Sequence, residues 1–408
     1  MDTFRSRDFH LLVGAAGLSA LGDLALAIPL ALEVRAQTGS ALAVSLFFLC
    51  MFGPIVLLAG VAGRLVDSVE NRRLLIGVSL AQAGATSLLL VADSPAALLV
   101  LTATIGSGLA IVAPAEFSLL PVAAGEDRVA AANGRIEAAR YLGMTAGPVL
   151  GGLLATAGAF HAAVVLNACS FLAVAIAGVA LQSRRHPAAA VSGERRRARD
   201  GLAVLVAEPA MRVVLATAVA SLALFSMSMT AELFFVLDVL HAGQTGYGVL
   251  IGVWTAGMVV GAALLGSRVP ATRLAPVALA AVAAQGAGLL GASLATALGA
   301  ALVGFALGGV AHGVKNVAIR TLIHQRVPDA LRGRAFAGYN AARNAAELGA
   351  LGLGGVLVNM IGARATLALS GATPLLLGLA ALVLTKGRGA AAVDPTTTRR
   401  SIHAHVEG

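Results

Sequence analysis

Twelve long apolar runs, separated by short polar breaks, limit what this sequence can fold into. A helix needs about 20 mostly apolar residues to cross the hydrocarbon core of a bilayer, and each run is long enough. The chain is 58% hydrophobic and 12% charged, which is too little charge for the surface of a water-soluble protein of 408 residues. The sequence therefore predicts an all-α integral membrane protein. The predicted spans are residues 10–33, 41–63, 73–92, 96–121, 129–157, 161–181, 211–237, 245–267, 274–292, 296–322, 333–360 and 364–385.

The second half of the sequence repeats parts of the first. Ala138-Ala139-Arg140 recurs as Ala341-Ala342-Arg343 and Gly151-Gly152 recurs as Gly354-Gly355, both displaced by 203 residues (343 − 140 and 354 − 151). We therefore expect two pseudo-symmetric bundles of six helices. The predicted domains are a first bundle at residues 1–181, a basic cytoplasmic linker at 182–208, a second bundle at 209–386 and a disordered cytoplasmic tail at 387–408.

Lys and Arg are concentrated in alternate loops between the predicted spans. One set of loops holds the basic run from Arg184 to Arg199, whereas the opposite set holds only Arg35 and Arg364. By the positive-inside rule, this distribution places both termini in the cytoplasm, with the protein in the cell membrane. The net charge of +9 then reflects topology and attraction to anionic membrane lipids. We expect no nucleic-acid partner, because no reading motif accompanies the charge.

Small and helix-bending residues mark the fifth predicted span. Gly143, Gly147 and Gly151 are four residues apart, so on a helix they form one smooth stripe that a neighbouring backbone can approach closely. Pro148 lies beside the stripe and removes one backbone donor, and Gly152 ends it. We expect tight helix packing along this stretch.

Ionisable side chains inside the predicted spans are candidate functional residues, because a buried charge there costs about 2.5–3.5 kcal/mol on insertion scales. Each needs a wet cavity or a partner of opposite charge. The alternatives are a proton-coupling or substrate site and a buried network that only fixes helix packing. The candidates are Asp23 near the middle of the first span, Glu116 near the cytoplasmic end of the fourth, Glu137 and Arg140 on one face of the fifth, and Lys315 well inside the tenth.

Four further residues could line a cavity for apolar molecules. Met227 and Met229 are flexible thioethers in the seventh span, Trp254 lies within the eighth, and His312 lies in the tenth. Each could instead pack against other helices. No clustered ligand set indicates a metal, no motif indicates a cofactor, and no nucleophile elbow or phosphate loop indicates an enzyme.

The loop between the second and third spans carries a signature of Gly, three residues, Asp and then a basic pair. The matching residues are Gly63, Asp67, Arg72 and Arg73. This loop resembles that of the major facilitator superfamily, although Ser68 and Glu70 depart from the usual pattern. In that family the Asp helps to hold the two halves together on the cytoplasmic side, which implies the same role for Asp67. We expect Arg343 to be the partner of Asp67 or Glu116 across the halves.

The stretch from Gly143 to Gly152 resembles the fifth-helix signature of exporters in the same superfamily, chiefly proton-coupled drug antiporters. The wider resemblance is nearest to enterobactin exporters and macrolide efflux proteins. It implies a central cavity that opens to each side in turn. It also implies a monomer that exports a small amphipathic organic molecule, such as a drug, siderophore or secondary metabolite, in exchange for protons. An importer, a uniporter or a lysolipid translocase of the same fold remains an alternative.

Overall fold

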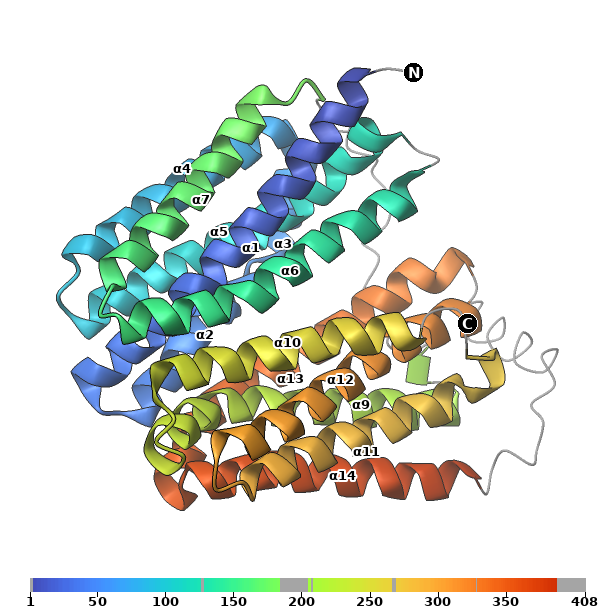
Figure 1. Ribbon diagram of the computed structural model, residues 1–408. Coiled ribbons are helices and arrows are strands. Elements are labelled where there is room, and N and C mark those ends of the chain that lie inside the picture. Colours follow the sequence, from blue (N-terminus) through green and yellow to red (C-terminus); the bar gives the residue numbers. More distant parts are fainter. Residues whose placement is uncertain are drawn as a thin grey trace.

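A computed structural model describes residues 3–125, 128–183, 205–206, 208–265, 269–327 and 329–386 (Figure 1). Within these residues the chain forms helices and no strand. The predicted linker at 182–208 lies mostly outside the described residues, and the predicted tail at 387–408 lies wholly outside them.

Serine caps fix where two helices of the first half begin. The Ser40 side-chain oxygen accepts the backbone N–H of Ala43 at 3.4 Å, and that of Ser94 accepts the N–H of Ala97 at 3.2 Å. Each cap satisfies a backbone donor that has no partner within the helix. The helices of this half are α1 (Thr3–Thr38), α2 (Ala41–Leu57), α3 (Ala59–Ser68), α4 (Asn71–Leu88) with the short turn η1 (Leu89–Val91), α5 (Pro95–Ala124), α6 (Val129–Thr156) and α7 (Phe160–Ala180).

Proline and glycine mark helix boundaries in the second half. Pro209 occupies the first turn of its helix, where the missing N–H costs nothing, and Gly362 adopts a positive φ of 82° in the turn between the last two helices. The helices are α9 (Pro209–Phe234) with the π-helical turn η3 (Phe235–Val239), α10 (Gly243–Leu265), the short turn η4 (Ala271–Arg273), α11 (Leu274–Ser293), α12 (Leu298–Arg326), α13 (Asp329–Ile361) and α14 (Ala363–Lys386).

Ten helices of the described chain are long and apolar enough to cross a membrane. The pair α2 and α3, bent by 49°, supplies an eleventh span. The twelfth is α6, whose apolar sequence is interrupted by Arg135, Glu137 and Arg140 but whose 28 residues run alongside α1. The chain is therefore a multi-pass membrane protein, and the predicted all-α fold with about twelve spans is confirmed.

The helices form two bundles, one from each half of the chain (Figure 1). In the first, α1 packs against α5, α6 and α7; in the second, α9 packs against α13 and α14, and α12 packs against α10 and α11. The bundles touch through α6 with α10 and through α2 with α13. They meet at one end of the molecule, the junction end. They diverge toward the other, the terminal end, where α1 begins and α14 ends (Figure 1).

Buried apolar side chains form three clusters, and only one of them links the bundles. The linking cluster lies at the junction end and includes Phe47 of α2 and Phe305 of α12. The other two belong to one bundle each, around Leu119 in the first and Ile319 in the second. Because apolar burial is the main favourable term in packing, the bundles are held together at the junction end and are separate bodies at the terminal end.

The two contacts between the bundles follow the 203-residue repeat. A side-chain carbon added to Gly152 on α6 would meet α10, and one added to Gly355 on α13 would meet α2. Gly152 meets Gln244, Thr245 and Gly248, and Gly355 meets Ala41, Leu42 and Ser45. The two sets of neighbours are equivalent in the repeat, because 244 − 41, 245 − 42 and 248 − 45 are each 203. The repeat in the sequence thus relates the two crossings in space.

Candidate functional site

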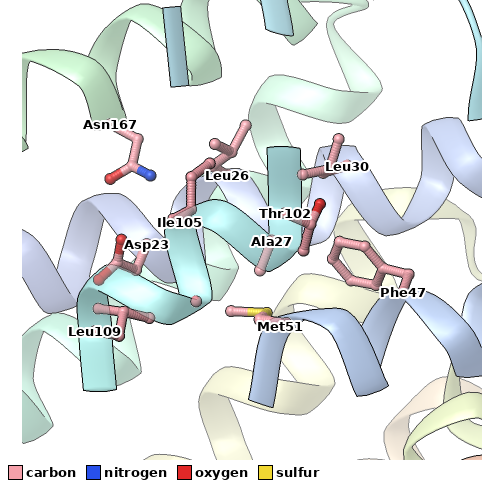
Figure 2. Close-up of a pocket in the computed structure, with 11 residues that line it drawn as sticks. Asp23, Leu26, Ala27, Leu30, Phe47, Met51, Thr102, Ile105, Leu109 and Asn167 are labelled. Carbon is pink, nitrogen blue, oxygen red and sulfur yellow. The ribbon is translucent and has the colours of Figure 1, made fainter. Parts of the chain in front are cut away.

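Asp23 lies in a small pocket of the first bundle that is partly open to solvent (Figure 2). The walls come from α1, α2, α5 and α7 and are mostly apolar, with Thr102 and Asn167 as the other polar side chains. Met51 lines the same pocket from α2. A carboxylate among apolar walls, with few polar groups around it, is costly to keep inside a membrane, which marks Asp23 as a candidate functional group.

One oxygen of the Asp23 carboxylate lacks a hydrogen-bond partner. Ser19 Oγ donates to Asp23 Oδ2 at 3.4 Å, whereas Oδ1 is buried and has no partner among the described residues. Gly22 brings α1 close to α7, because a side-chain carbon at that position would lie 2.6 Å from Asn167 Oδ1 and 2.5 Å from Ser170 Oγ. The close approach places Asp23 near Asn167, with one oxygen open to a proton or a ligand donor.

The predicted charged cluster of Glu116, Glu137 and Arg140 is present. Arg140 reaches from α6 to Glu116 on α5, with 2.5 Å between Nη2 and Oε2, and its Nη1 lies 3.9 Å from Glu137 Oε1. Its guanidinium also lies 5.0 Å from the ring centroid of Phe117. The Glu116 side chain is 2% exposed, so the ion pair is buried and its partners stabilise each other where neither could stand alone. Asp23 lies within electrostatic range of both Glu116 and Arg140.

The glycine stripe of α6 is where α1 approaches most tightly, as predicted. A side-chain carbon on Gly147 would lie 2.8 Å from the carbonyl oxygen of Leu21, and one on Gly151 would lie 2.6 Å from that of Ala25. Gly143 meets the backbone of α1 in the same way. The stripe thus holds the segment of α1 that carries Asp23.

The remaining residues of the motif have a different neighbour. Gly152 and Pro148 face Gly248 of α10, in the second bundle. The motif therefore has two faces. One holds α1 and the other forms part of the junction between the bundles.

The signature segment between the second and third spans is largely helical, which corrects its description as a loop. Gly63 and Asp67 lie on α3, which continues to Ser68 because Ala62 and Val66 are buried along one of its faces. Both Gly63 and Asp67 are exposed.

The basic pair of the signature is bound within the first bundle. Arg72 donates to the carbonyl oxygens of Gly178 at 2.8 Å and Val179 at 2.5 Å, at the end of α7. Arg73 pairs with Glu70 at 2.9 Å. Neither contact reaches the second bundle.

The expected pairing of Arg343 with Asp67 or Glu116 does not occur in this structure. Arg343 lies 4.0 Å from Glu347 on its own helix, and Glu116 is bound by Arg140. Among the described residues Asp67 has no ion-pair partner. The reason is geometric, because α3, which carries Asp67, packs against α2, α4 and α5 of its own bundle.

Polar contacts between the bundles lie at the junction end in the described part of the chain. Arg35, at the end of α1, pairs with Asp238 of η3 at 2.5 Å and lies 5.3 Å from the ring of Phe234. Thr156 and Thr245 are hydrogen bonded at 2.7 Å. Arg35 and Asp238 are themselves 203 residues apart, so each occupies the same place in its half.

The four residues considered for an apolar cavity are packed within the second bundle. Trp254 stacks on Phe225, with ring centroids 4.5 Å apart and planes at 8°, and its ring lies 5.6 Å from that of His312. Met227 is 5% exposed and packs at Gly354 of α13, and Met229 lies against the junction-end cluster. In this conformation these side chains take the packing role that the sequence left open.

Lys315 has neutral partners, in contrast to the expected carboxylate or wet cavity. Its Nζ donates to Gln285 Oε1 at 2.7 Å and to Ser221 Oγ at 3.5 Å, and the residue is 2% exposed. Glu232 is equally buried and accepts a hydrogen bond from Ser228 at 2.6 Å. Within the described residues, no group of three His, Cys, Asp or Glu side chains is placed to hold a metal ion.

Sequence reasoning missed the uncharged members of these sites. Asn167, Gln285 and Ser221 each stand next to an ionisable group inside a span. Amides and hydroxyls in apolar helices hydrogen bond across helices, so their presence within a span was the available signal. Nothing in the sequence shows which charge each one faces.

Comparisons with known proteins agree with this architecture. The sequence profile of the Major Facilitator Superfamily matches residues 12–346. A search of curated protein sequences found no match.

Several solved transporter structures share the fold. A bacterial homologue of the human lysosomal transporter Spinster, in an inward-facing and unoccupied conformation, has a TM-score of 0.69 at 15% identity, covering 98% of each chain. The nucleoside transporter NupG has a TM-score of 0.73 at 11% identity, covering 93% of this chain and 99% of its own. A peptide transporter of the POT type has a TM-score of 0.73 at 15% identity, covering 93% of this chain and 94% of its own. This chain belongs to the Major Facilitator Superfamily.

Proposed function

We propose that the protein is a secondary active transporter that exports a small amphipathic organic molecule from the cell in exchange for protons. The observation that carries the proposal is the Asp23 pocket, where a carboxylate with one unpartnered oxygen lies beside the buried pair of Glu116 and Arg140. Groups of this kind inside a membrane mark substrate and proton pathways. The structural neighbours are transporters by description, which favours this role over an enzymatic one.

The distribution of basic residues assigns the two ends of the molecule to the two sides of the membrane. With both termini in the cytoplasm, the terminal end faces inward and the junction end faces outward. The bundles are then closed outside, through Arg35 and Asp238, and apart inside. We therefore interpret the structure as an inward-open conformation in the cell membrane.

Alternating access gives each ionisable group a role. In the outward-open conformation a proton from outside binds to Asp23 or to the cluster of Glu116 and Glu137. Inward opening separates Asp67 from the second bundle and produces the arrangement seen here. Substrate from the cytoplasm then displaces the proton, which is released into the cytoplasm. The loaded protein opens outward and releases the substrate.

Export is the direction favoured by the motif from Gly143 to Gly152. Its two faces connect the helix that carries Asp23 to the junction between the bundles. A movement of α1 caused by a change of charge at Asp23 would thereby be passed through α6 to its contact with α10, which must open. A proton-driven importer would need the same link, so the direction rests on the resemblance of this stretch to the fifth-helix signature of exporters.

Inside-out vesicles with an imposed proton gradient test the proposal. A panel of antibiotics, siderophores and lysolipids is screened for uptake that collapses the gradient. Asp23→Asn is expected to abolish proton-driven uptake, whereas Asp93→Asn, which changes an exposed carboxylate outside the pocket, serves as the matched control. Intact proton-coupled export in Asp23→Asn would show that Asp23 is not the coupling residue. Substrate release from these vesicles instead of uptake would reverse the direction.

A further inference from the structure

The two bundles differ in how they neutralise one pair of equivalent cations. Arg140 and Arg343 occupy the same place in the repeat (343 − 140 is 203). Arg140 is held by Glu116 and Glu137, but the equivalent positions in the second bundle are Ile319 and Asn340 (116 + 203 and 137 + 203). Within the part of the chain that the structure describes, Arg343 has Glu347 as its ion-pair partner, at 4.0 Å, and neither equivalent position carries an acid.

A second basic side chain lies next to Arg343. Lys315 is within electrostatic range of Arg343, as is the imidazole of His312, one turn away on α12. Among the described residues, the hydrogen-bond acceptors of Lys315 are Gln285 and Ser221. A charged amine that is 2% exposed and lacks a carboxylate partner is costly to keep in a protein interior. A bound anionic ligand would lower that cost.

Three buried nitrogen atoms around Lys315 have no hydrogen-bond partner among the described residues. They are Nε of Arg343, Nδ1 of His312 and Nε2 of Gln285. Buried polar atoms are normally paired, so three of them beside an unbalanced amine mark a place prepared for an acceptor. The acceptor that fits both the nitrogens and the charge is an oxyanion.

The surroundings also indicate what the rest of such a ligand is like. Phe225 stacks on Trp254 and lies 5.6 Å from His312, so an aromatic surface borders the basic group. The Arg343 side chain is 37% exposed, whereas Lys315 lies deeper. A ligand would therefore meet Arg343 first and place its apolar part against the aromatic side chains.

We propose that the second bundle contains an anion-binding subsite, formed by Arg343, Lys315 and His312, that receives the carboxylate or sulfonate of an amphipathic substrate. The inference rests on the proposed transport function and adds to it the charge of the substrate. It also divides the work between the bundles. The first bundle carries the acids that exchange protons, and the second holds the anionic group of the cargo.

Binding to the purified full-length protein in an uncharged detergent tests the subsite. Three carboxylates of different shape are each compared with their neutral amide: 1-naphthylacetate, decanoate and cholate. Affinity is obtained from the dose dependence of the thermal unfolding temperature, followed through the fluorescence of Trp254, the only Trp of the chain. At least one carboxylate is expected to bind about tenfold or more tightly than its amide, the gain of one charge-assisted contact.

Variants identify the residues that produce the preference. Lys315→Gln and Arg343→Gln are each expected to reduce the preference for carboxylate over amide toward onefold. Ile319→Glu, which restores the acid found at the equivalent position of the first bundle, is expected to do the same by pairing with Arg343. Arg320→Gln is the matched control, because this exposed cation lies on the same helix as Lys315 but outside the subsite.

Two results would overturn the subsite. One is equal affinity for carboxylate and amide in all three pairs. The other is a preference that survives in both Lys315→Gln and Arg343→Gln. Because binding is measured without a proton gradient, loss of the subsite leaves the vesicle assay for export untouched. Carboxylate binding without transport in vesicles would instead remove the transport proposal and retain the subsite.

Discussion

Replacing Gly152 by Ala is expected to shift the protein from the inward-open toward the outward-open conformation. Gly152 is one of the points at which α6 meets α10 across the junction. An added methyl group would lie 2.9 Å from the carbonyl oxygen of Gln244 and 3.1 Å from the Cα atoms of Thr245 and Gly248. All three atoms belong to backbone, which cannot turn aside as the end of a side chain can. The clash is relieved only when the bundles separate at the junction end.

The size of the shift follows from the cost of overpacking. Inserting a methyl group into a tightly packed contact typically costs about 1–3 kcal/mol, and this cost applies only to the conformation in which the junction is closed. The ratio of outward-open to inward-open molecules should therefore rise by roughly 5- to 150-fold. Gly355→Ala should act in the same direction, because its neighbours are the equivalents of those of Gly152.

Spin labels at the terminal end measure this ratio. Cys50 and Cys169 are first replaced by Ser, and Ser68→Cys and Gln325→Cys then provide exposed labelling sites on the first and second bundles. Closure of the terminal end accompanies opening of the junction. Pulsed electron-spin distance distributions should accordingly gain a shorter component in Gly152→Ala.

Gly134→Ala is the matched control, since Gly134 lies on the same helix and an added carbon would have no neighbour within 4 Å. A distance distribution in Gly152→Ala that is the same as in this control would refute the reasoning. It would mean that the junction absorbs the methyl group and that this crossing does not restrict the movement of the bundles.

Three further perturbations have expected outcomes. Arg35→Asp should weaken the closed junction by only about 0–1 kcal/mol, because the side chains of Arg35 and Asp238 are 30% and 46% exposed. Adding Asp238→Arg reverses the pair and should restore the spin-label distance distribution of the labelled protein without either substitution. Glu116→Ala leaves Arg140 without its buried partner and should cost about 3–5 kcal/mol of stability, measured as a lower unfolding temperature in detergent. An unchanged unfolding temperature would mean that Glu137 takes the place of Glu116. Gly147→Val should also lower the unfolding temperature, by about 1–3 kcal/mol of stability, because the added side chain would meet the backbone of α1 at Leu21 and Ala25. A normal unfolding temperature would show that the stripe is not tightly packed.

Most of the fold could be predicted from the sequence, because in a bilayer the apolar runs themselves dictate the helices. The spacing of Gly143, Gly147 and Gly151 predicted a close contact, and that contact is present with α1. The segment from Gly63 to Ser68 was harder, because a short amphipathic helix at the membrane surface carries the same charges as a loop. Burial of Ala62 and Val66 decides between them, and burial depends on neighbouring helices.

The candidate site was predicted in part, and the failures have a common cause. The cluster of Glu116, Glu137 and Arg140 could be expected because charges in apolar helices must find each other. The partner of Arg343 could not, because it depends on which end of the molecule is closed. A sequence encodes all conformations of a transporter, whereas a structure shows one of them.

The ion pair between Arg35 and Asp238 has a consequence for how such a chain can arise. The two positions are counterparts in the repeat, and they face each other where the halves meet. In a symmetric dimer of two identical half-length proteins, a residue on the twofold axis meets its own copy, so Arg would face Arg or Asp would face Asp. This attraction therefore requires two copies that were free to diverge from each other, as the two halves of this fused chain are.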